Sequence, residues 1–90
     1  MQGPQDPQLD STATRILKTI DNTTRMRGDT VVRGAEIRRT LGLTPKQLVD
    51  SLVDLSAKNL VSVTGELTDD RIDLAVLSVH PSNRSFVRAL

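Results

Sequence analysis

A chain of 90 residues with a single aromatic side chain, Phe86, has few ways to build an interior. Its core must consist of leucine, isoleucine and valine, and its length allows one small domain. A single aromatic residue also excludes the stacking platforms of several aromatic rings on which proteins hold single strands or unpaired bases. With 37% apolar and 26% charged residues, the composition is that of an ordinary globular protein.

The residues that usually carry chemistry are scarce. The chain has no cysteine and one histidine, His80, so disulfides, zinc fingers, iron–sulfur clusters and thiol nucleophiles are excluded. Its five glycines are scattered and form no phosphate-binding loop. Asp69 and Asp70 have no histidine or cysteine ligand nearby and indicate a solvated turn. We therefore expect a binding module without catalytic residues, metal, cofactor or small-molecule substrate.

No apolar stretch reaches the roughly 18 residues that a membrane span needs. The first eight residues contain no apolar run that would serve as a secretory signal. We expect an intracellular protein, cytoplasmic or associated with the nucleoid or nucleus, that does not contact a membrane.

Charge is unevenly distributed along the chain. Residues 24–46 contain six basic and two acidic residues, whereas residues 47–90 contain six acidic and four basic ones. The two halves of the sequence therefore differ in sign, which favours a partner on one side of the molecule.

Apolar spacing predicts two helices in the first half of the chain. Residues 1–9 lack periodicity and are expected to form a flexible lead-in. Asp10 offers an N-cap, and a helix ending near Asn22 is indicated by apolar residues at helical spacing, namely Ala13, Ile16, Leu17 and Ile20. A polar loop over 23–30 and a very short strand at 31–32 follow. A second helix begins at Gly34 and stops at Gly42.

The sequence Thr44-Pro45-Lys46-Gln47 is the clearest indication of a helix start in the chain. Threonine at the cap, proline in the first turn and glutamine three residues on form a capping box. The helix it opens is expected to extend to about Lys58, where Asn59 ends it in the left-handed conformation.

Alternation over 60–64 and 71–76 predicts a β-hairpin, which Pro81 ends. We expect a domain over 10–79 and an extension over 80–90, which is either a short helix capped by Ser82 or a frayed tail. The predicted core comprises Ile16, Ile20, Ile37, Leu41, Leu43, Leu48, Leu52, Leu55, Val61, Val63, Ile72 and Leu74.

This order of elements resembles that of the winged helix-turn-helix family. The resemblance covers about residues 11–79 and rests on Glu36-Ile37, Leu41-Gly42-Leu43-Thr44, Leu48, Leu52, Leu55 and Asn59-Leu60-Val61. It implies an α+β, mostly α fold, with a three-helix core and a C-terminal two-stranded wing. Since this scaffold serves many functions, it indicates fold more strongly than task.

The resemblance implies binding of duplex DNA, in transcription regulation or genome maintenance. The first turns of the third helix would enter the major groove, bringing Thr44, Lys46, Gln47 and Ser51 to the bases. Phosphates would be held by Arg25, Arg27, Arg33, Arg38 and Arg39. On the wing, Arg71 stands among Glu66, Asp69 and Asp70 and would be a poor probe of the minor groove.

Two features depart from the family pattern. Arg38 stands where many relatives have a small residue at the crossing of the second and third helices. The outward face of the third helix carries Asp50 and Asp54, which repel phosphates. Val49 and Val53 either widen the core contact of this helix or, beside these aspartates, form an apolar strip that suits a protein partner.

Three arrangements therefore remain open. The third helix binds DNA; or the arginine side binds DNA while the third helix faces a partner; or the module serves protein assembly alone. Phe86, Val87 and Leu90 near the C-terminus would either pack on the first helix or meet a second copy in a homodimer.

Overall fold

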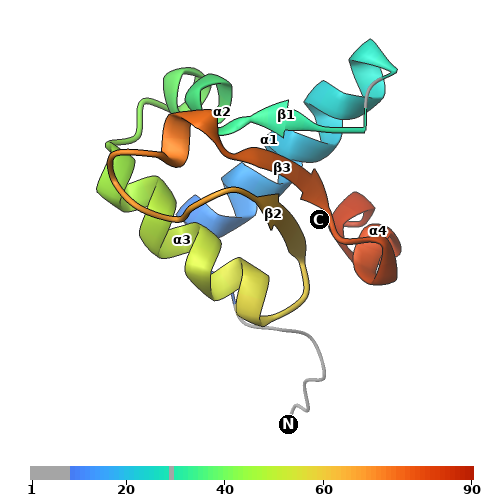
Figure 1. Ribbon diagram of the computed structural model, residues 1–90. Helices are drawn as coiled ribbons and strands as arrows, with labels where there is room; N and C mark the ends of the chain where they lie inside the picture. Colours follow the sequence, from blue (N-terminus) through green and yellow to red (C-terminus); the bar gives the residue numbers. More distant parts are fainter. Residues whose placement is uncertain (1–8, 29) are drawn as a thin grey trace, which may run out of the picture.

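The computed structural model describes residues 9–28 and 30–90 and has an α+β architecture rich in helix (Figure 1). In chain order the elements are α1 (Ser11–Arg27), β1 (Val32–Arg33), α2 (Gly34–Leu41), α3 (Pro45–Ala57), β2 (Val61–Thr64), the 3₁₀ turn η1 (Ile72–Leu74), β3 (Val76–Val79), the 3₁₀ turn η2 (Pro81–Asn83) and α4 (Arg84–Arg88).

Helix α1 begins as predicted but is longer. The Asp10 side chain accepts a hydrogen bond from the backbone of Ala13 at 2.7 Å and caps the helix. The predicted end near Asn22 and the loop over 23–30 are wrong, because α1 continues to Arg27 and stops at Gly28, which has a φ of 71°. Thr24 is buried, and its hydroxyl donates to the Ile20 carbonyl at 2.9 Å, so this polar stretch extends the helix.

The turn between α2 and α3 is confirmed. Gly42 ends α2 with a φ of 68°. Both halves of the capping box form: the Thr44 backbone donates to Gln47 Oε1 at 2.9 Å, and the Gln47 backbone donates to Thr44 Oγ1 at 3.2 Å. Asn59 has a φ of 58° just after α3, as its position predicts.

The three strands form one antiparallel sheet in the order β1-β3-β2. Val32 of β1 pairs with Leu77, and Val63 of β2 pairs with the same residue from the other side. The short first strand therefore joins the predicted two-stranded wing in one sheet. The predicted first strand at 31–32 lies one residue later.

The second wing strand, predicted at 71–76, is wrong. Ile72 to Leu74 form η1, and the strand covers Val76–Val79. A 3₁₀ turn repeats every three residues, so Ile72 and Ala75 are buried together while Leu74 is 61% exposed. The alternation that predicts a strand also places Leu74 in the core, where it does not lie.

The core lies between α1, α2 and α3 and one side of the sheet (Figure 1). Helix α1 packs against β3, and α3 packs against β2. The remaining predicted core residues are buried or pack partly buried against the core.

The C-terminal extension belongs to the same core, because Val87 of α4 is 2% exposed. Ser82 does not cap α4, which begins at Arg84; instead its backbone donates to His80 Nδ1 at 3.1 Å. Of the predicted lead-in, 1–8 lies outside the described residues, and Leu9 packs against the core.

Candidate nucleic-acid interface

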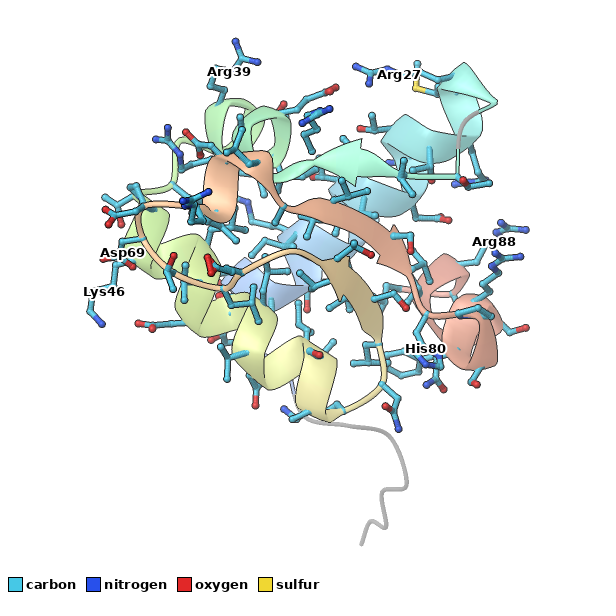
Figure 2. All side chains as sticks on the ribbon, viewed as in Figure 1. Arg27, Arg39, Lys46, Asp69, His80 and Arg88 are labelled. Atoms are coloured by element: carbon cyan, nitrogen blue, oxygen red, sulfur yellow. The ribbon has the colours of Figure 1, made fainter. Side chains whose placement is uncertain are left out.

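Arginines outnumber acids at one edge of the described part of the molecule, whereas basic and acidic residues are mixed around α3. Figure 2 shows Arg27 and Arg39 projecting from one edge, Arg88 at the adjoining end, and Lys46 and Asp69 at the opposite end. We call this edge and the adjoining end together the arginine edge; its residues line two clefts, Arg27, Arg33 and Arg39 in one and Arg25, Arg84 and Arg88 in the other, and they belong to α1, β1, α2 and α4. The arginine edge does not include α3.

A cleft of about 350 Å³ lies on the arginine edge where α1, β1 and α2 meet. We call it the β1 cleft; its lining residues are Arg27, Val31, Val32, Arg33, Ala35, Glu36, Arg39 and Val76. Arg27 forms an ion pair with Glu36, the only acid in the described lining. The cleft therefore carries an excess of positive charge.

Local structure explains why Arg33 and Arg39 point outward. Arg33 follows the buried Val32 in β1, and side chains alternate between the two sides of a strand. Arg39 lies two positions after the buried Ile37 in α2, on the opposite side of the helix. Neither arginine forms an ion pair with a described residue.

Arg38 is engaged within the fold. Its Nε and Nη2 each donate to a carboxylate oxygen of Asp73 at 2.8 Å, joining α2 to η1. These hydrogen bonds, together with the opposite charges, raise the pKa of Arg38 and lower the pKa of Asp73. The long side chain thus links α2 to the segment between β2 and β3, and its contact with a phosphate stays a prediction.

Replacing Asp73 with asparagine should lower the urea midpoint of unfolding at pH 7. A carboxylate whose pKa is lowered by folding stabilises the fold above its unfolded pKa of about 3.9 and loses that effect as pH falls through the lower folded value. The midpoints of Asp73→Asn and wild type should therefore converge only below about pH 4. Asp69→Asn, which removes the charge of a nearby exposed carboxylate, is the control. Equal effects of the two substitutions on the midpoint would contradict a stabilising contact between Arg38 and Asp73.

The exposed face of α3 is nearly neutral because its charges pair within the helix. Lys46 Nζ lies 3.3 Å from an Asp50 oxygen, and Lys58 Nζ lies 2.9 Å from an Asp54 oxygen. The predicted base readers are partly engaged as well: Thr44 and Gln47 form the capping box, and Ser51 is half-buried.

The two valines predicted to act together on α3 are separated by burial. Val49 is 9% exposed and belongs to the core, whereas Val53 is 51% exposed beside Asp54. Val49 therefore widens the core contact of α3, whereas a contact between Val53 and a protein partner stays a prediction. The structure leaves Val53 as a single apolar side chain on a polar helix face.

The segment between β2 and β3 is acidic. Arg71 is exposed, and the nearby exposed acids are Glu66, Asp69 and Asp70. Because η1 is tied to α2 through Asp73, this segment is folded back against the domain. Its charge makes it a poor contact for a phosphate backbone.

A second cleft, of about 190 Å³, was not predicted from the sequence. It brings Arg84 and Arg88 of α4 together with Arg25 of α1 around Asp21. The four-residue spacing of Arg84 and Arg88 places both on one side of a helix. This spacing is the feature of the sequence from which their pairing could have been predicted.

The described residues contain no group of three or more histidine, cysteine, aspartate or glutamate side chains arranged to hold a metal ion. Within 9–28 and 30–90, no helix combines the length and apolar character needed to cross a membrane. Comparison of the chain with models of known families, with curated proteins and with solved structures finds no match.

Proposed function

We propose that this chain is a winged-helix module that binds duplex DNA through its arginine edge. The observation that carries the proposal is the excess of arginine at this edge, compared with the nearly neutral exposed face of α3. The edge has six arginines against two described acids, Asp21 and Glu36; Asp29, outside the described residues, is a third acid in that stretch of sequence.

Phosphate contacts supply most of the non-specific affinity of proteins for DNA. Such contacts need basic side chains whose charge is not already neutralised. Arg33 and Arg39 meet this requirement, whereas Lys46 and Lys58 each face an aspartate on their own helix. The arginine edge is therefore the better platform for a phosphate backbone.

The winged-helix assignment is supported by element order and strand pairing. A short strand after α1 joins the hairpin strands, and a capped α3 follows a tight turn after α2. In this proposal, α3 is turned away from the DNA backbone.

A 20-base-pair duplex titrated by fluorescence anisotropy at several salt concentrations tests the function. With roughly four phosphates engaged, the logarithm of affinity should fall with the logarithm of salt at a slope of about −3 to −4. Absence of binding at low salt would overturn the proposal.

The exposure of Val53 supports a second candidate function, in which α3 packs against a second copy of this chain. In that case Val53→Asp should convert a dimer to a monomer in sedimentation equilibrium while the circular dichroism stays unchanged. Met26→Asp is a matched control, since Met26 is 86% exposed on α1. A wild-type chain that sediments as a monomer would remove this candidate.

A further inference from the structure

The second cleft lies where α4 packs beside α1, close to the end of β3 (Figure 1). We call it the α1–α4 cleft; its lining residues are Asp21, Thr24, Arg25, Thr30, Val79, Arg84 and Arg88. Three of these are arginines, contributed by two helices that are distant in the sequence. Figure 2 shows Arg88 projecting at this end of the molecule.

Asp21 organises the cleft. It is only 8% exposed, and its two oxygens face different arginines: Arg25 Nη2 lies 3.1 Å from Oδ2, and Arg88 Nη2 lies 3.8 Å from Oδ1. The same Arg25 nitrogen donates to Asn22 Oδ1 at 2.9 Å. The buried carboxylate of Asp21 thus orients the guanidinium groups of Arg25 and Arg88.

The charges of the cleft do not cancel. Asp21 neutralises one of the three guanidinium groups, and Arg84 forms no ion pair with a described residue. Two positive charges are therefore left in a concave site, where low-dielectric walls concentrate the field. Thr30 is also in the lining, and a threonine hydroxyl can donate a further hydrogen bond.

We propose that the α1–α4 cleft binds a phosphate monoester. Guanidinium groups match phosphoryl oxygens with two parallel hydrogen bonds. A phosphate monoester carries about −1.5 to −2 charges at pH 7, which matches the excess charge of the cleft. A carboxylate or an internal phosphodiester carries a single negative charge and leaves part of that excess uncompensated.

The group comes either from a strand end of a nucleic acid or from free phosphate. The first source rests on the proposed function and deepens it, because Arg25 and Arg27 lie in the last turn of α1 and connect this cleft with the β1 cleft. A duplex lying along the arginine edge would then present its 5′-phosphate to the α1–α4 cleft.

Inorganic phosphate tests the cleft without nucleic acid. We expect phosphate, compared with chloride at equal ionic strength, to raise the melting temperature of the full chain in a saturable way. Arg84→Gln should raise the apparent Kd at least tenfold while the circular dichroism stays unchanged. Arg15→Gln, which removes an exposed arginine of α1 outside both clefts, should leave the Kd unchanged.

Two duplexes that differ only in a 5′-phosphate identify the source. Tighter binding of the phosphorylated duplex, lost in Arg84→Gln, supports a strand end; a phosphate response with no preference between the duplexes supports free phosphate. No phosphate response together with no preference overturns the cleft proposal, as does a preference that survives Arg84→Gln. If neither duplex binds but phosphate still acts, the DNA function fails and the cleft stands.

Discussion

Replacing Arg33 and Arg39 together with glutamine is expected to weaken duplex binding by about tenfold or more. Each arginine that contacts a phosphate adds about one unit to the salt slope, so the double variant should lose about two units. The protein should remain folded, because both side chains project outward and form no ion pair with a described residue. Fluorescence anisotropy across a salt series measures both quantities.

The matched control is on α3. If the arginine edge holds the DNA, Lys46→Ala and Gln47→Ala should leave affinity and salt slope unchanged. Binding through α3 predicts the opposite pattern: these substitutions weaken the complex, Asp50→Ala strengthens it, and loss of Arg33 and Arg39 has little effect. That second pattern would overturn the assignment of the interface.

Arg38 must be left out of this experiment. A charge reversal of the neighbouring Arg38 and Arg39 follows naturally from the sequence, which predicts a phosphate contact for both. In the structure, Arg38 is bound to Asp73 on both oxygens. Its reversal would place two carboxylates together and disturb η1, so any loss of binding would reflect a disturbed fold as well as a lost contact.

The sequence predicts the structure correctly where the conformation depends on residues close together in the chain. Thr44 and Gln47 satisfy each other's backbone across one helical turn. Gly42 and Asn59 adopt the left-handed conformation at which helices end. These features depend on near neighbours, so their spacing predicts them.

Sequence patterns predict the wrong element where the conformation depends on contacts between residues far apart in the chain. The apolar alternation at Ile72, Leu74 and Val76 is equally compatible with a strand and with a 3₁₀ turn followed by a strand. Hydrogen bonding from the Ile72 backbone to the Thr68 carbonyl and the tie from Asp73 to Arg38 select the turn. Residue 38 and residue 73 are far apart in sequence, and no local pattern reports their contact.

The candidate site, too, could be predicted only in part from the sequence. A cluster of arginines over 25–39 is visible in the sequence, but which of them remain available depends on their three-dimensional partners. Glu36 engages Arg27, and Asp73 engages Arg38. The contribution of Arg84 and Arg88 depends on the packing of α4 through Val87, which the sequence left open between contact with the first helix and contact with a second copy.

Gly34→Ala is expected to destabilise the domain more than any other single substitution considered. A Cβ at position 34 would lie 2.1 Å from the Ile72 carbonyl oxygen and 3.1 Å from its carbon. Gly34 also donates its backbone N–H to the Ala75 carbonyl at 2.9 Å, so α2 and η1 are held together at this point. Since backbone meets backbone, no side chain can rotate away to relieve the clash.

Overpacking of this kind costs about 3 kcal/mol, which is a large share of the stability of a domain this small. The melting temperature should fall by roughly 12–24 °C. Gly28→Ala is the control, because Gly28 has a φ of 71° but nothing within 4 Å of an added Cβ; it should cost only about 1–2 kcal/mol. Equal melting temperatures for the two variants would show that α2 does not approach η1 this closely, whereas a clear gap would support the contact that fixes the acidic segment against α2.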